Sequence, residues 1–334
     1  MRRSPARQEA PQEFIWTPSV GPDAQASARL RASFPKPRHP MGEAWFMGKR
    51  RMYTELMEQD LEDLPIQYFQ NVLEELFRGA CGFGLIQEWD DWYHFLLPRL
   101  LSRSFEKSYS EYPLEYLISA FMAVHPDQVR EDAGNYEHQR YPGLRQDVLI
   151  TLGRSIMAPE LWESGEIVPG RALHPAPLPP EETFWAWSTV SGDFSASMFF
   201  CLKYLEPDEI DPWLQSVFRI ESSYWRAQLL VWLLGIQPLL NSEMMQSGQL
   251  SNELLWEPSY TLGYYHRNAD TPFILASEAN RRAFRGSLSR HLTAPLFLEW
   301  IDSFAHVDYL EGELGNLPDQ FVDAFLSGFL LPDQ

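Results

Sequence analysis

Histidines and carboxylates lie close together in two places along the chain, and each pattern could support chemistry. In the stretch 125–138, His125 and His138 flank four carboxylates, a set that can bind zinc or iron when three or four ligands converge. In the second place, Asp90 and His94 share one face of a predicted helix and could orient an acid–base pair. Neither place has HExxH or CxxC spacing, so a solvated loop and an ordinary surface pair are the favoured interpretations.

Signatures of nucleotide binding and of covalent catalysis are missing from the sequence. No GxxxxGK[ST] loop or GxSxG elbow occurs, and the glycines at 79, 82 and 84 have the wrong spacing for a dinucleotide site. Cys81 and Cys201 have no histidine close by in the sequence, and their apolar neighbours predict buried free thiols. Tyr264, Tyr265 and His266 would suit a ligand pocket or an ordinary domain edge. The sequence therefore predicts no catalytic residue, no metal site and no cofactor.

The charge of the chain is large and unevenly distributed. The net charge is −19, from 27 basic and 46 acidic residues. Residues 1–51 carry +6 and the remainder carries −25. Binding to nucleic acid needs a basic face that neutralises phosphates, and anionic lipid makes the same demand. The charge therefore argues against direct nucleic-acid binding and against docking on a membrane.

Two acidic clusters are predicted to bind a basic partner protein, because complementary fields speed encounter and reject wrong partners. The first lies at residues 206–211, and the second lies within 291–334, where no Lys or Arg occurs. A basic island (Arg281, Arg282, Arg285 and Arg290) separates them. The predicted partner-binding residues are Glu206, Asp208, Glu209, Asp211, Asp308, Glu311, Glu313, Asp319 and Asp323. The alternative is that these acids form solvated faces that keep the protein dispersed.

The N-terminus and the most apolar segment indicate where in the cell the protein is expected. Arginines open the chain, but no apolar stretch of a secretory signal follows them. The segment 227–240 is the most apolar, yet it is too short to span a bilayer and predicts a buried helix. We therefore expect a cytoplasmic protein.

Prolines indicate how the chain is divided. Seven of the 26 prolines lie in residues 1–40 and six more lie in 159–180. We expect an extended basic arm at 1–45, a helical half at 46–158, a linker or excursion at 159–180 and a second helical half at 181–334 with an acidic end.

Helical patterns dominate the two halves. The stretch 64–79 places its apolar residues on one face, with Pro65 suited to the first turn and Gly79 to the position after the last turn. Further helices are expected at 92–103 (with a kink or break at Pro98), 113–124, 142–157, 194–205, 212–220, 222–234, 271–285, 295–304 and 318–329. Strand signals are thin, with 260–265 the best. The predicted fold class is all-α, with many helices.

Paired Leu-rich helices with an internal proline recur in the two halves, as in Trp92–Leu101 and Trp232–Leu240. This pattern resembles HEAT-like and armadillo-like α-helical repeat proteins, without a fixed repeat period. The resemblance implies an α-solenoid that serves as a protein-binding scaffold. An irregular helical domain is the alternative.

The composition also bears on function. Aromatic residues make up 14% of the chain and predict a large core, with a binding interface as the alternative. Arg outnumbers Lys by 23 to 4, which favours internal ion pairs. The favoured function is a non-enzymatic inhibitor that neutralises a basic partner protein, in the manner of bacterial immunity proteins that neutralise toxins. The alternatives are a helical scaffold and an enzyme with a dispersed site.

Overall fold

A computed structural model describes most of the chain. The described residues are 20–42, 50–79, 86–101, 114–126, 128–129, 141–157, 162–163, 166–167, 174–178, 182–186, 188–241, 275–304 and 322–323. The calls at 1–19, 81, 131–138, 242–274, 308–319 and 324–329 lie outside these residues.

Helices form the body of the described structure. They are α1 (Ala24–Ser33), α2 (Glu55–Glu58), η1 (Leu61–Asp63), α3 (Ile66–Gly79), α4 (Ile86–Leu100), α5 (Leu114–Val124), α6 (Leu144–Leu149), η3 (Leu152–Met157), α7 (Ser188–Tyr204), α8 (Ile210–Phe218), α9 (Ser223–Gly235), α10 (Gln237–Leu240), α13 (Glu278–His291) and α14 (Ala294–Phe304). The predicted helical character is confirmed.

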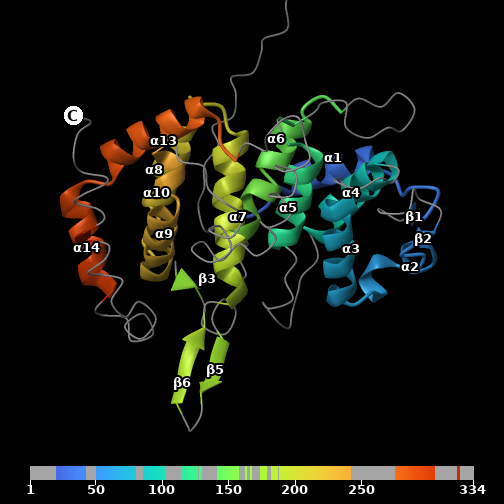
Figure 1. The fold of residues 1–334 in the computed structure, drawn as a ribbon, viewed down its shortest axis with the longest axis horizontal. Coiled ribbons are helices and arrows are strands. Elements are labelled where there is room, and N and C mark those ends of the chain that lie inside the picture. Colours follow the sequence, from blue (N-terminus) through green and yellow to red (C-terminus); the bar gives the residue numbers. More distant parts are fainter. Residues whose placement is uncertain are drawn as a thin grey trace, which may run out of the picture.

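Short strands accompany the helices and form two-stranded antiparallel pairs. They are β1 (Met41–Gly42) with β2 (Arg51–Met52), β3 (Trp162–Glu163) with β4 (Glu166–Ile167), and β5 (His174–Leu178) with β6 (Glu182–Ala186). Four of the strands lie in or beside the Pro-rich stretch 159–180, where the sequence predicts a linker. The β5–β6 hairpin projects from the helical body (Figure 1).

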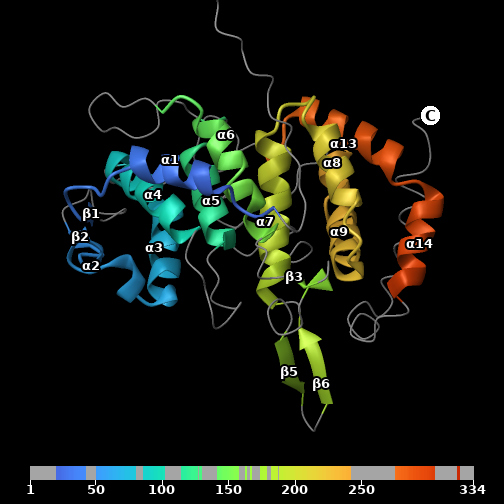
Figure 2. The ribbon, with the colours of Figure 1, turned by 180° about the vertical axis from the view of Figure 1, so that it is seen from behind.

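The long helix α7 stands between two groups of helices (Figures 1 and 2). On one side it packs against α5 and η3, and on the other against α9 and α13. Helices α1 to α6 lie on the first side, and α8 to α14 lie on the second (Figure 1). The division into two helical halves at 46–158 and 181–334 stays a prediction. Whether the helices form a regular solenoid stays a prediction.

Helix α1 corrects the expectation of an extended N-terminal arm over 24–33. The Asp23 carboxylate caps this helix by accepting the Ala26 N–H at 2.7 Å, which satisfies a donor of the first turn. Leu30 is fully buried, and α1 packs on α4 and α6. The prolines that suggested an arm flank this helix and do not interrupt it.

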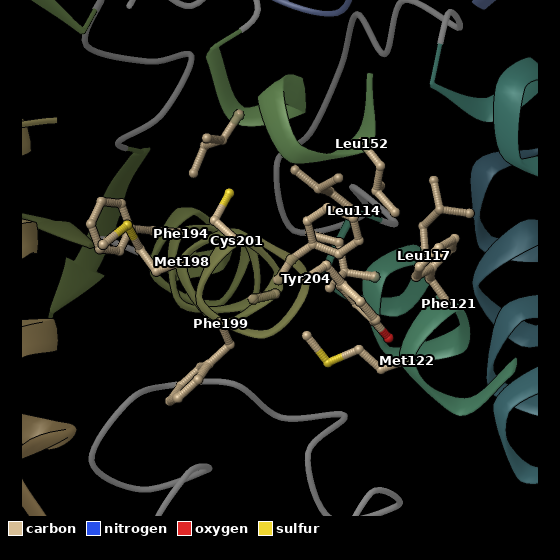
Figure 3. Packing of buried hydrophobic residues seen from close by; sticks show 14 of the residues in the cluster. Leu114, Leu117, Phe121, Met122, Leu152, Phe194, Met198, Phe199, Cys201 and Tyr204 are labelled. Atoms are coloured by element: carbon tan, nitrogen blue, oxygen red, sulfur yellow. The ribbon is translucent and has the colours of Figure 1, made fainter. Parts of the chain in front are cut away.

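Helix α5 is buried along its whole length. Its sequence LEYLISAFMAV is mostly apolar, as expected for a helix that packs against α3, α4 and α7. Phe121 packs edge-on against Phe200 and Tyr204 of α7, with ring centroids 5.4 and 5.3 Å apart. Figure 3 shows these helices meeting through Leu117, Phe121 and Tyr204. The aromatic residues therefore serve the core, as predicted.

Most predicted helices are present with shifted ends. Helix α4 begins six residues before the predicted start and continues through Pro98 without a break. Proline lacks the N–H that would donate one turn back, and the helix ends two residues later, at Leu100. The predicted helix at 142–157 is two pieces, α6 and η3. Helix α13 begins seven residues later than expected because the Ser277 hydroxyl caps it by accepting the Asn280 N–H.

Candidate functional site

Asp211, a predicted partner-binding residue, is held at the surface by contacts with another helix of the protein. Its Oδ1 accepts hydrogen bonds from Ser287 Oγ at 2.7 Å and Arg290 Nη2 at 2.6 Å, and it lies 3.1 Å from His291 Nε2. These three donors all belong to α13, so Asp211 joins α8 to α13. They lower the pKa of Asp211 to about 2. Asp211 of the acidic cluster at 206–211 is thus paired with Arg290 of the basic island.

The same residues include the three types found in serine hydrolases, but not their arrangement. In a catalytic triad the histidine lies between the serine and the aspartate and takes the proton of the hydroxyl. Here Asp211 lies between Ser287 and His291, and the hydroxyl donates directly to the carboxylate. Ser287 is also fully buried. This group therefore holds two helices together and offers no nucleophile.

The other acids of 206–211 divide into one bound and two exposed residues. The Glu209 carboxylate forms an ion pair with Arg145, whose guanidinium also donates to the Tyr204 carbonyl. Glu206 and Asp208 are exposed on the turn before α8. Glu206 and Asp208 are therefore the more exposed acids of this cluster, although the side chain of Asp211 also remains 46% exposed.

The second predicted cluster is described at one residue. Asp323 is exposed, whereas Asp308, Glu311, Glu313 and Asp319 lie outside the described residues. Their part in partner binding stays a prediction.

A further acidic surface was missed from the sequence. Residues 55–63, named here the acidic segment, form α2 and η1 and carry five exposed acids, Glu55, Glu58, Asp60, Glu62 and Asp63. The signal was available, since no Lys or Arg occurs between residues 52 and 77. The carboxylates of Glu58, Asp60 and Asp63 have no ion-pair partner among the residues that the structure describes.

The acidic segment borders a hollow of about 340 Å³. One side is formed by Asp60, Leu61, Glu62 and Asp63 of the segment, and the other by Arg31, Arg99 and Leu100. The Arg31 Nε donates to the Pro98 carbonyl, and Arg99 donates to the Phe34 and Phe95 carbonyls. Arg99 also lies over the Phe95 ring, 3.9 Å from its centroid. Carbonyl oxygens and a ring hold both arginines without removing their charge, so the lining combines three carboxylates on one side with two guanidinium groups on the other.

The two histidines considered for chemistry meet in the core. His94 Nε2 lies 3.1 Å from His125 Nε2, and both side chains are fully buried. His94 Nδ1 lies 2.6 Å from the Asp90 carbonyl oxygen, so the partner is the backbone and not the carboxylate. The sequence favours an ordinary surface pair of Asp90 and His94 over an acid–base pair, and the surface pair is wrong because both side chains are buried. His125 is the one histidine of the 125–138 stretch that the structure describes.

A buried acid was also missed from the sequence. Asp193 of α7 accepts the backbone N–H of Glu115 at 2.9 Å and so caps the start of α5 from a distant part of the chain. Burial, followed by the charge of Glu115, raises the pKa of Asp193 well above its usual 3.8. The role is structural, because this carboxyl group ties α5 to α7.

Other possibilities for chemistry are limited within the described part of the chain. No group of three His, Cys, Asp or Glu side chains there could hold a metal ion. Cys201 is a buried free thiol, as predicted, and burial raises its pKa. No described helix is both long and apolar enough to cross a bilayer. The acidic segment with its hollow is therefore the candidate functional site.

Comparison with known proteins finds no family model, curated protein or solved structure that matches the chain.

Proposed function

We propose that this protein is a non-enzymatic binding protein that captures a basic partner protein on its exposed carboxylates. The observation that carries the proposal is the acidic segment, where five exposed acids follow one another without Lys or Arg. In its most specific form, the protein is an inhibitor that neutralises a toxic basic protein.

The distribution of ion pairs supports this proposal. Glu209 and Asp211 are paired with arginines within the protein, whereas Asp60, Glu62 and Asp63 of the acidic segment border an open hollow. Internal ion pairs between exposed side chains add little stability, about 0–1 kcal/mol each. Exposed carboxylates that lie close together repel one another. A partner with Lys and Arg side chains would relieve this repulsion. An Arg or Lys side chain of that partner would pair with the exposed carboxylates of the acidic segment.

The experiment measures association with the partner as a function of salt. The full-length protein is used to isolate its partner from the source cells, and the partner is then purified alone. Electrostatic capture predicts an association rate that falls at least tenfold between 20 mM and 300 mM salt, because exposed charges are screened beyond a Debye length. A triple variant, Glu58→Gln with Asp60→Asn and Asp63→Asn, is expected to slow association several-fold without loss of thermal stability.

A matched control keeps the number of removed charges equal. Glu299 and Asp302 are exposed on α14, far from the acidic segment in Figure 1, and Asp208 is exposed before α8. Neutralising these three should slow association less than the triple variant does. A rate that is insensitive to salt, or equal effects of the two triple variants, would refute capture by the acidic segment.

A scaffold that binds partners through apolar contacts is the second candidate, and one observation favours it. Leu298 of α14 is 58% exposed beside buried Phe297 and Trp300 and would offer a partner an apolar contact. A scaffold of this kind predicts that Leu298→Ser weakens partner binding and that salt does not.

A further inference from the structure

The β5–β6 hairpin has little support from the rest of the described structure. Each strand packs chiefly on the other, and neither packs extensively on any further described element. Figures 1 and 2 show the hairpin projecting away from the helices, although a single residue separates the end of β6 from α7. An isolated two-stranded hairpin is marginally stable in water, and additional strands stabilise it. The hairpin would therefore gain stability from a neighbouring strand.

The register of the hairpin determines where the main-chain groups of β6 point. Pro175 lies opposite Trp185, and Pro177 lies opposite Thr183. In an antiparallel ladder, hydrogen-bonded pairs alternate with pairs that are not hydrogen-bonded, and proline, which has no N–H, occupies the second kind. The N–H and carbonyl groups of Thr183 and Trp185 therefore point away from β5. Within the part of the chain that the structure describes, no strand pairs with this outer edge of β6.

The outer edge of β6 is complementary to a second copy of itself in the antiparallel direction. A two-fold axis at Phe184 places Thr183 of each molecule opposite Trp185 of the other. Both of these pairs are then of the hydrogen-bonded kind, so each exchanges an N–H···O bond in both directions. Glu182 lies opposite Ala186 of the other molecule, so like charges are not paired across the axis. Thr, Phe and Trp are also residue types that favour strands.

The antiparallel arrangement leaves room for the two helical bodies. The base of one hairpin lies beside the tip of the other, so the bodies lie at opposite ends of the joined sheet. Successive residues of a strand are about 3.4 Å apart, which separates the two copies of Ala186 by about 14 Å along the strands. This distance exceeds the Debye length of about 8 Å in physiological salt. Repulsion between two molecules that each carry a net charge of −19 is therefore largely screened.

We propose that the protein forms a two-fold dimer in which the β6 strands of two molecules join their hairpins into one four-stranded sheet. The outer strands of that sheet are the two copies of β5, where the prolines at 175 and 177 have no N–H to donate. Pairing thus uses one edge of each hairpin, and assembly stops at two molecules. A second copy is the occupant that leaves no unprotected edge, whereas a strand of another protein would bring a free edge of its own.

The experiment is sedimentation equilibrium of the full-length chain from about 1 µM to about 1 mM, the range in which weak association is measured. The wild type should change from monomer to dimer and no further. Thr183→Pro removes an outward N–H and spares the bonds within the hairpin, so it should raise the dissociation constant at least about tenfold. The matched control Thr183→Val keeps this N–H and should dimerise as the wild type does. A wild type that is monomeric at every concentration, or equal dissociation constants of Thr183→Pro and Thr183→Val, would overturn the proposal.

A second variant tests why assembly stops at two molecules. Pro175→Thr combined with Pro177→Thr gives the outer edge of β5 the two N–H groups that it lacks. Both edges of the hairpin can then pair, so this variant should form assemblies larger than a dimer. A variant that still stops at the dimer would overturn the assignment of the open and blocked edges.

A measurement on the unmodified protein keeps the proposal testable if Thr183→Pro does not fold. The N–H groups of Thr183 and Trp185 are hydrogen-bonded only in the dimer. Their exchange with solvent should therefore slow at least about tenfold when the protein concentration is raised well above the dissociation constant. The N–H of Phe184 points toward β5 and should change less. Exchange at Thr183 and Trp185 that is independent of concentration, or an equal change at Phe184, would overturn the dimer.

Discussion

The contact of Asp211 with α13 gives a prediction that separates a structural acid from a partner-binding one. Asp211→Ala removes the common acceptor of Ser287, Arg290 and His291. Asp211→Asn keeps an oxygen for the Ser287 hydroxyl and removes only the charge. Asp208→Ala is the matched control, because Asp208 is exposed in the same cluster.

The expected loss of stability can be worked from burial. Ser287 is fully buried, and a buried hydroxyl without its acceptor costs about 1–3 kcal/mol. The side chains of Arg290 and Asp211 are 60% and 46% exposed, so their ion pair contributes about 0–1 kcal/mol after screening by solvent. Asp211→Ala should therefore lower the free energy of unfolding by about 1–4 kcal/mol, and Asp211→Asn by about 1 kcal/mol or less. Asp208→Ala should stay within about 0.5 kcal/mol of the wild type.

The assay is urea unfolding at pH 7, followed by an acid series. The pKa of Asp211 is about 2 in the folded protein and ordinarily 3.8. Because the folded pKa is depressed, its contribution is present above pH ~4 and is lost as the pH falls toward about 2. Asp211→Asn should lack this loss. Equal stability of Asp211→Ala and Asp208→Ala at pH 7 would refute the reasoning. Asp211 would then again be a candidate for partner binding.

Three further predictions concern other contacts. The stability of the wild type should fall as the pH rises above about 4, because the raised pKa of Asp193 means that the folded state holds a proton that the unfolded chain has lost. Asp193→Asn should lack this pH dependence. A wild type whose urea midpoint matches that of the variant from pH 4 to 8 contradicts this. Trp232→Ala should cost about 3–5 kcal/mol in urea unfolding, since the indole is 1% exposed between rings of α7 and α13; a cost below 1 kcal/mol would mean that α9 does not pack against α7 and α13 through this indole. Arg29→Gln should cost about 1–2 kcal/mol and speed proteolysis at α1, because Arg29 pairs with the buried carboxylate of Asp147; unchanged cleavage would show that this pair does not hold α1.

Helices with a clear apolar face could be predicted from the sequence, and those without one could not be delimited. Helix α3 matches the predicted stretch 64–79 closely, because a single face is buried and Pro65 precedes it. Helix α1 has a weak apolar pattern and lies between prolines, so composition alone suggested an arm. Its position depends on long-range contacts such as the Asp23 N–H donating to the Ile150 carbonyl.

The candidate site was only partly predictable for the same reason. Charge runs show where acids occur, but not which arginine reaches them in the fold. Glu209 and Asp211 are neutralised by residues 64 and 79 positions away. The acidic segment is a local pattern and was overlooked, whereas the His94–His125 contact joins residues 31 positions apart and has no local signal.

The β5–β6 hairpin has a consequence for how separate molecules of this protein meet. Pro175 pairs with Trp185, and Pro177 pairs with Thr183. Proline has no N–H, so in a two-stranded ladder these positions must be the ones whose nitrogens point away from β6. The free edge of β5 therefore presents carbonyl oxygens without any N–H between residues 175 and 177. A strand from another molecule cannot continue the sheet along that edge, and the projecting hairpin is protected there from edge-to-edge aggregation.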